Sequence, residues 1–333
     1  MKRVIGIGNA LTDMLVNLKS DTVLGKYKLA KGSMTLVNSE FQNDIAKSVA
    51  GMPYSLSLGG SAGNTIRAMA QLGCKVGFIG KVGVDKTGDF FEQALVNLGV
   101  EPIIFRGSDR SGRCISLVSQ DGERTMATSL GAALELTHTE VMPTVFDGYD
   151  TLYIEGYLVQ DHSLIENVVK TAKAAGLKVA IDLASFNVVE ENLEFLSALV
   201  RNYVDILFAN EDEARVFSGE EEPLNALQYI SQMCELSIVK IGTKGALIKR
   251  GEETVHVGIM AAAKRVDTTG AGDFYAAGFL AGLCQGLTLR QCGTIGAITA
   301  GKVIEVVGTT FGDEAWQEIH TYVEKVKNDR YLF

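Results

Sequence analysis

Hydrophobic and polar positions along this chain follow two alternating patterns. Short apolar runs rich in β-branched residues predict buried strands at Arg3–Ile7, Lys75–Ile79, Thr151–Ile154, Lys178–Ile181, Ile206–Ala209 and Ile238–Ile241. Apolar residues at helical spacing predict helices at Thr65–Leu72, Thr87–Leu98, Ser163–Ala175 and Leu224–Met233, and a mostly helical end from Ala271 to Lys327. Because strands and helices alternate, the pattern predicts an α/β fold whose mostly parallel sheet is covered on both faces.

Two stretches break this alternation. Leu15–Asn38 is extended and has little helical pattern. Arg113–Ser129 contains two β-rich runs joined by Asp121-Gly122, which is a strong hairpin signal. We expect the two stretches to form a small sheet that projects from the core as a lid. With no linker or repeat in sight, we expect one domain over 1–333, with its lid near residues 15–38 and 106–130.

Composition narrows the functional classes. The 333 residues are 47% hydrophobic and 21% charged, which is typical of a globular protein with a large core. A net charge of −9 argues against a nucleic-acid partner, because phosphate backbones attract a surplus of Lys and Arg. The five cysteines form no CxxC pair and the four histidines are isolated. We therefore expect reduced thiols, a cytoplasmic protein, no membrane partner and no metal cluster.

The segment with the clearest chemistry is Asp267–Asp273. The β-prone residue Val266 leads into it, and the apolar run Phe274–Leu283 after it predicts a helix. Glycines in such a turn let a ligand approach the backbone, and the free N–H groups of the helix start can hold an anion. A carboxylate there, Asp273, could take the proton of a hydroxyl that attacks phosphorus. An aspartate that only caps a helix would give the same segment.

A second glycine-rich turn precedes the helix predicted at Thr65–Leu72. It contains Gly59, Gly60, Ser61 and Asn64, which place small polar groups at a strand-to-helix turn. Together the two segments resemble the paired signatures of the ribokinase-like (PfkB) family of sugar and nucleoside kinases, in the same order and over nearly the whole chain. The resemblance implies a three-layer αβα fold with a β-sheet lid, and an ATP-dependent kinase that uses Mg²⁺. The loops near Asp267 and Gly308 are candidates for a monovalent cation site such as one for K⁺.

The resemblance also assigns roles on the phosphoryl side. Asp273 becomes the general base, beside an anion hole at Gly270, Ala271 and Gly272. Arg124, on the lid hairpin, would reach the transferring phosphate. Nucleotide contacts would come from Asn210, Lys240, Thr243 and Gly245, and magnesium would be organised through water by Asn210 and Glu213. The residues alone leave a simpler alternative for each segment. Arg124 could be a solvated arginine on a hairpin, and Lys240–Gly245 could be a plain strand–turn–strand connection. Asn210–Glu213 could be the acidic first turn of a helix.

On the acceptor side, Asn9 and Asp13 follow the first strand, where open α/β sheets bind ligands. With Asn64 they could hold the hydroxyls of a sugar, although an aspartate that merely starts a turn would look the same. Within the family, the segments Gly8–Asp13, Gly59–Asn64, Asp121–Thr125 and Tyr153–Tyr157 resemble the adenosine kinase branch. That alignment places the base pocket at Leu11, Cys114 and Tyr157.

These features favour an ATP-dependent kinase that phosphorylates the primary hydroxyl of a ribosyl nucleoside, adenosine to AMP, and that acts as a monomer or homodimer. The alternatives are a fructokinase or ribokinase of the same family, and a non-catalytic regulator that binds a sugar or nucleotide. Two other motifs are set aside. Gly6-Ile7-Gly8 imitates a dinucleotide fingerprint but has Leu11 at the third glycine position, and Gly296–Lys302 has Walker A spacing inside a predicted helix.

Overall fold

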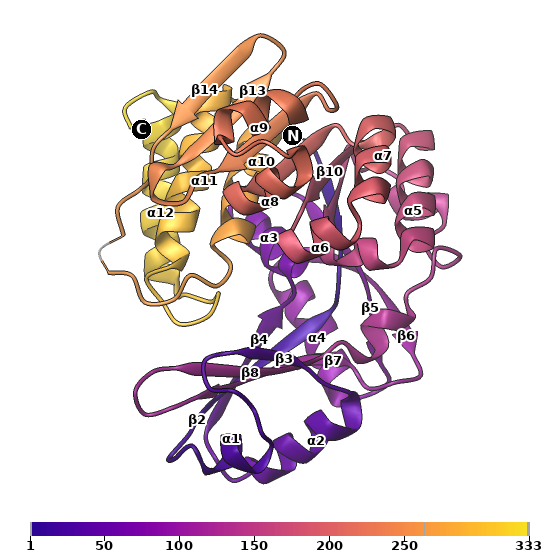
Figure 1. Ribbon diagram of the computed structural model, residues 1–333, viewed down its shortest axis with the longest axis vertical. Coiled ribbons are helices and arrows are strands. Elements are labelled where there is room, and N and C mark those ends of the chain that lie inside the picture. Colours follow the sequence, from indigo (N-terminus) through magenta and orange to yellow (C-terminus); the bar gives the residue numbers. More distant parts are fainter. Residues whose placement is uncertain (1, 263, 332–333) are drawn as a thin grey trace.

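The computed structural model describes residues 2–262 and 264–331, and a nine-stranded sheet forms its centre (Figure 1). The strands are β1 (Val4–Ile7), β5 (Val76–Gly83), β6 (Val100–Gly107), β9 (Thr151–Glu155), β10 (Lys178–Asp182), β11 (Ile206–Asn210), β12 (Leu236–Lys240), β13 (Ala246–Arg250) and β14 (Glu253–Val257). Their order is β14-β13-β12-β11-β10-β9-β1-β5-β6. Neighbours from β12 to β6 are parallel, and β13 and β14 are added antiparallel at one edge.

Helices cover both faces of this sheet, because each strand buries alternate residues on opposite sides. In β11, Ile206 and Phe208 belong to one apolar cluster, whereas Leu207 and Ala209 belong to another. The first cluster includes α3 (Ser61–Gln71), α4 (Lys86–Asn97), α10 (Ala271–Cys284), α11 (Leu289–Val303) and α12 (Asp313–Lys327). The second includes α5 (His162–Ala174), α6 (Phe186–Glu191), α7 (Leu193–Tyr203), α8 (Glu211–Ser218) and α9 (Pro223–Ile230). The predicted α/β class with a covered, mostly parallel sheet is confirmed.

A second sheet, of five strands, forms the lid and lies apart from the main sheet (Figure 1). It contains β2 (Leu11–Asn17), β3 (Met34–Leu36), β4 (Tyr54–Gly59), β7 (Gly112–Val118) and β8 (Arg124–Ser129), in the order β3-β8-β7-β2-β4. Its own apolar core joins Val16 and Leu117 to α1 (Thr22–Lys26) and α2 (Ser39–Ser48). The predicted β7–β8 hairpin is present, but β4 and α2 fall outside the predicted lid ranges. The assignment of residues 1–333 to a single kinase domain stays a prediction.

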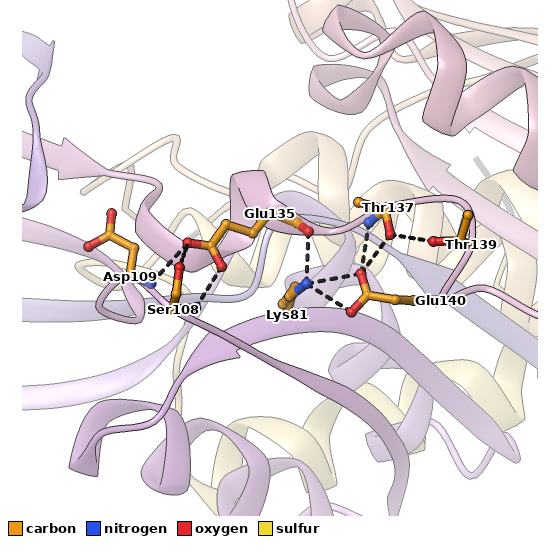
Figure 2. Close-up of polar contacts among 7 residues, drawn as sticks. All are labelled: Lys81, Ser108, Asp109, Glu135, Thr137, Thr139 and Glu140. Carbon is orange, nitrogen blue, oxygen red and sulfur yellow. Dashed lines mark hydrogen bonds and ion pairs between the residues drawn. The ribbon is translucent and has the colours of Figure 1, made fainter.

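A polar cluster anchors the lid where β6 leads into β7 (Figure 2). The carboxylate of Glu135, at the end of the 3-10 helix η1 (Gly131–Glu135), accepts hydrogen bonds from the backbone N–H groups of Ser108 (2.6 Å) and Asp109 (2.9 Å). Lys81, buried on β5, donates to the Glu135 carbonyl and to the Glu140 carboxylate, both at 2.8 Å. The strand leaving for the lid and the segment returning from it are therefore tied to the main sheet at one point.

Smaller features also bear on the expectations. The remaining 3-10 turns are η2 (Pro143–Phe146), η3 (Gly156–Gln160) and η4 (Gly242–Lys244). Helix α1 lies inside the stretch that was expected to be extended. It was not predicted, because five residues with one buried position, Leu24, are too few to show a helical period. All five cysteines are buried free thiols. The Walker-like Gly296–Lys302 lies within α11, as predicted. In the described part of the chain, no helix combines the length and the apolar character needed to cross a membrane.

Candidate active site

A row of polar side chains lies along the edge of the main sheet that is formed by the carboxyl ends of its parallel strands. Lys240, Asn210, Asp182 and Glu155 are the last residues of β12, β11, β10 and β9, and Asn9 lies just after β1. The strand register pairs Asn210 with Lys240 and Asp182 with Glu155, so these groups lie side by side. The carboxyl ends of parallel strands are where open α/β sheets bind ligands, and this edge is therefore the candidate site.

A cavity of about 1040 Å³ lies against this edge and reaches the lid. Nearly all residues predicted to form the site line it: Asn9, Leu11, Asp13, Gly60, Ser61, Asn64, Cys114, Arg124, Tyr157, Asn210, Glu213, Lys240, Thr243, Gly245, Gly270, Ala271, Gly272 and Asp273. Gly59 is not among the lining residues. A side chain at Gly59 would collide with the Asp13 carboxylate, so this glycine makes room for Asp13 rather than for a ligand.

The two glycine-rich segments meet at Asp273, in the first turn of α10. Its Oδ1 accepts a hydrogen bond from the Ser61 hydroxyl (2.7 Å), and its Oδ2 accepts one from the Asn64 amide (2.8 Å). Gly270 adopts a φ of 77°, and a side chain there would strike Thr309. The turn thus needs glycine, as predicted. Ser61 and Asn64 come from the first turn of α3, so the starts of two helices converge on one carboxylate.

The start of a helix favours the charged form of a carboxylate, but the pKa of Asp273 is raised above its usual value. Enclosure by protein raises this pKa to about 6, and the nearby Asp182 adds to the rise. Hydrogen bonds from Ser61 and Asn64 and the charge of Lys240 lower it by less. Desolvation thus outweighs the helix dipole, and Asp273 is still mostly ionised at pH 7.

Asn9 and Asp13 reach the cavity from different elements. The Asn9 amide and backbone N–H both donate to the buried Glu155 carboxylate, at 2.6 and 2.9 Å. Glu155 also accepts from the backbone N–H of Ala62 at 2.9 Å, and burial raises its pKa to about 7. Asp13 lies within lid strand β2, so the alternative that it only starts a turn is wrong. Burial raises its pKa to about 6, against the attraction of Arg67 and Arg124.

Arg124 connects the lid to the anion-binding turn. It forms an ion pair with Asp267 and donates to the Ser116 hydroxyl at 3.0 Å. Asp267 also accepts from the N–H groups of Thr269 and Gly308, both at 2.9 Å. Burial raises the pKa of Asp267, but these hydrogen bonds and the Arg124 charge lower it overall. Arg124 is therefore held at the entrance to the turn, and not in the solvated hairpin position of the alternative.

The nucleotide side combines an ion pair with tight backbone turns. Lys240 donates to the Asp182 carboxylate at 2.7 Å, and its ammonium would lie 3.2 Å from a side chain added at Gly272. Gly245 has a φ of 98°, and a side chain there would strike β14. Thr243 is exposed on η4. The expected strand–turn–strand connection is therefore also present, with its glycine facing the same cavity.

Asn210 and Glu213 are tied to each other at the start of α8. The side-chain Oδ1 of Asn210 accepts from the Glu213 backbone N–H (2.8 Å), while the Glu213 carboxylate accepts from the Asn210 backbone N–H and side-chain amide, both at 2.7 Å. Burial raises the pKa of Glu213 to about 7. Within the described residues, no group of three or more His, Cys, Asp or Glu side chains is placed to hold a metal. The Asn210 amide and the Glu213 carboxylate suit a Mg²⁺ ion that keeps its water and takes further oxygens from phosphates.

Several residues of the site were not predicted from the sequence. Glu155 and Asp182 end apolar strands, and the strand-end rule that selected Asn9 would have selected them as well. Arg67 lies in the interior of helix α3, and Thr309 lies in a loop that is distant in the sequence. Neither belongs to a local sequence motif that indicates a site. The loops of Asp267 and Gly308, named as candidates for a cation site, do lie together.

Comparisons with known proteins agree with this geometry. The family described as pfkB family carbohydrate kinase matches residues 37–316. A crystal structure of adenosine kinase from Sinorhizobium meliloti is 33% identical, with a TM-score of 0.83 over 96% of this chain and 99% of that one. A probable sugar kinase from Rhizobium etli CFN 42 is 31% identical, with a TM-score of 0.83 over 96% and 98%. Adenosine kinase from Saccharomyces cerevisiae is 28% identical over 93% of this chain and 97% of its own length.

Proposed function

The chain belongs to the pfkB family of carbohydrate kinases, which makes it an ATP-dependent kinase with an alcohol acceptor, and from this premise we propose that its acceptor is a purine nucleoside, adenosine first. The proposal rests on the apolar character of the cavity mouth. Met34 and Leu36 on the lid, and Leu134 and Tyr157 on the main body, line the cavity and are 43–68% exposed. A purine base offers a flat apolar face that could cover them, whereas a free sugar offers hydroxyls.

The phosphoryl transfer follows from the start of α10. Asp273 takes the proton of the acceptor's primary hydroxyl, and that oxygen then bonds to the γ-phosphorus of ATP. The bond from this phosphorus to the β–γ bridging oxygen breaks, and ADP leaves with the electron pair. The backbone N–H groups at Gly270 and Gly272 would face the charge that develops on the phosphoryl oxygens. The Ala271 N–H, predicted to join them, donates to the Thr268 carbonyl at 3.2 Å and would have to leave it to do so. Arg124 adds positive charge from the lid.

The remaining groups bind and orient the two substrates. Asn9, Asp13 and Asn64 hold the ribose hydroxyls, with Leu11, Cys114 and Tyr157 beside the base. Thr243, Gly245 and Lys240 lie along the nucleotide. Mg²⁺, near Asn210 and Glu213, would neutralise phosphate charge when bound. A monovalent cation at the Asp267 and Gly308 loops and a monomeric or dimeric state belong to the same proposal.

An acceptor panel tests the proposal. The protein is incubated with ATP, Mg²⁺ and either adenosine, guanosine, ribose or fructose, and products are identified by mass. We expect AMP to form fastest. Efficient phosphorylation of fructose or ribose, without phosphorylation of nucleosides, would favour the second candidate, a sugar kinase. The probable sugar kinase from Rhizobium etli supports this candidate, because its TM-score equals that of the Sinorhizobium meliloti adenosine kinase. Binding of ATP or sugar without product from any acceptor would favour a non-catalytic regulator.

A further inference from the structure

Arg67 is a buried cation that the proposed reaction leaves without a task. It lies in α3, one turn beyond Asn64, and is only 7% exposed. Burial lowers its pKa to about 10, against the attraction of Asp13 and Asp273, so it stays charged at neutral pH. A charged group is costly at this depth unless its donors are satisfied.

The hydrogen bonds of Arg67 go to three residues, Asn64, Thr309 and Thr310. Its Nη2 and Nε donate to the Asn64 carbonyl oxygen at 2.9 and 3.3 Å. Nη2 also donates to the Thr309 carbonyl at 2.7 Å and to the Thr309 hydroxyl. Nη1 donates to the hydroxyl of Thr310 at 3.2 Å. Arg67 therefore links the start of α3 to the loop that lies against Gly270.

This arrangement fixes which way the Asn64 side chain faces. A guanidinium can only donate, so Asn64 must turn its carbonyl oxygen toward Arg67. The Thr309 hydroxyl donates to the same oxygen at 3.2 Å. The amide NH₂ then has to face the Asp273 carboxylate, where it donates at 2.8 Å. If Asn64 were flipped, two oxygen acceptors would face each other and Asp273 would lose one of its two hydrogen bonds.

We infer that Arg67 is a positioning residue for phosphoryl transfer: it sets the orientation of Asn64, and through Asn64 it holds the Asp273 carboxylate toward the acceptor. The inference rests on the proposed function, because it assumes that Asp273 is the base. Asp273 is also influenced by Asp182 on β10, Lys240 on β12 and Asp13 on β2, and these groups stay unchanged when Arg67 is replaced.

The first test compares Arg67→Met with Arg67→Lys. Misplacing a base costs about 10- to 100-fold in turnover, so kcat should fall by that factor in Arg67→Met while the KM for ATP stays the same. Loss of the positive charge should also move the acid limb of the kcat–pH profile upward, because Arg67 and Asp273 attract each other. Arg67→Lys keeps the charge but not the forked contact, so its acid limb should stay in place while kcat remains low.

Lys302→Met is the matched control. Lys302, on α11, is also a buried cation; it pairs with Glu318 of α12 at 2.7 Å, and it is not itself among the residues that line the cavity. Its loss should lower the melting temperature without changing kcat or the pH profile. If Arg67→Met does not fold, the comparison between Arg67→Lys and the wild type decides alone, because a normal kcat in Arg67→Lys would contradict the inference.

A double-mutant cycle separates positioning from general stability. If Arg67 acts through Asn64, Arg67→Met should add little to the loss of kcat already caused by Asn64→Ala. An equal further fall in the Asn64→Ala background would overturn the inference, as would an unchanged kcat and pH profile in folded Arg67→Met. Inactivity of the wild type on every acceptor would instead defeat the proposed function, so the two failures can be told apart.

Discussion

At the scale of single residues, Asp273 carries the most specific prediction. Asp273→Asn keeps the shape of the side chain but removes the base, so turnover should fall by about 10²–10⁴-fold. The substitution also removes a charge whose burial is costly, so thermal stability at pH 8 should be kept or raised. Initial rates and a melting curve check both parts. Near-normal turnover would sink the assignment of the base.

Asp13 tests the acceptor side in the same way. Asp13→Ala should weaken acceptor binding by about 2–5 kcal/mol, because a buried pair of hydroxyls would lose a charged partner. ATP affinity, measured without acceptor, should hardly change, since Asp13 belongs to the lid strand β2 and Lys240 to the far side of the row. Calorimetric titration measures both affinities. Loss of ATP binding with acceptor binding intact would mean that the two sites are reversed.

The sequence points to individual residues where they belong to short local motifs. Asp273 and Ser61 belong to short motifs, and their side chains meet across 212 residues of chain. Arg67 could not be recognised in this way, because its role depends on a contact with Thr309 that only the tertiary fold creates. The pKa direction of Asp273 also required the fold, since burial is a property of the surroundings.

At the scale of elements, the lid hairpin presents Arg124 to the turn before α10. Arg124→Ala should lower kcat by about 10²–10³-fold, as expected for the loss of one group that stabilises transition-state charge, with a smaller effect on acceptor affinity. Arg113→Ala is the control, because Arg113 lies in the same lid sheet but donates to Gln42 instead. Equal losses in both variants would show that lid stability, and not Arg124, limits turnover.

The anchor at Glu135 leads to a prediction about lid movement. Glu135→Ala leaves the N–H groups of Ser108 and Asp109 without their protein acceptor, so the free energy of unfolding should fall. Amide exchange at these two residues should become faster. Because a loose lid admits water, the rate of ATP hydrolysis should also rise relative to the rate of phosphoryl transfer to the acceptor. Glu166→Ala, which removes an exposed pair with Lys170 on α5, should change none of these. Unchanged exchange would contradict the anchoring role.

Elements with many buried positions were predicted well, and short ones were not. α5 and β11 lie within a residue or so of their expected ranges, because a repeated apolar pattern leaves few alternatives. α1 escaped prediction because it is too short, whereas β4 was expected only as the strand before the turn at Gly59–Asn64 and not as part of the lid. The membership of β4 in the lid depends on pairing with β2, which no local pattern contains.

At the scale of the whole molecule, the site should make the protein less stable as pH rises. The pKa values of Asp13 and Asp273 are raised to about 6, and those of Glu155 and Glu213 to about 7. A group with a raised folded-state pKa contributes stability below its unfolded pKa and loses that contribution as pH rises through the folded value. The melting temperature of the ligand-free protein should therefore be higher at pH 5 than at pH 8.

Acidic groups elsewhere do not reverse this trend within that window. The pKa values of Asp85 and Asp267 are lowered, so their contribution is present at pH 5 and disappears only in stronger acid. Differential scanning calorimetry between pH 5 and pH 8 measures the balance. A melting temperature that rises steadily over this range would contradict the prediction that ionisation of the buried carboxylates in the site destabilises the fold.

The separation of the two sheets has a consequence for how such enzymes diversify. Apart from Arg124 on β8, the groups proposed for phosphoryl transfer belong to the main sheet and its helices, whereas Met34, Leu36 and Cys114 on the proposed acceptor side belong to the lid. Mutations in the lid can therefore change the acceptor while the chemistry of transfer is inherited intact. A lineage built in this way can exchange nucleosides for sugars through one small sheet, and a laboratory could follow the same route by grafting that sheet alone.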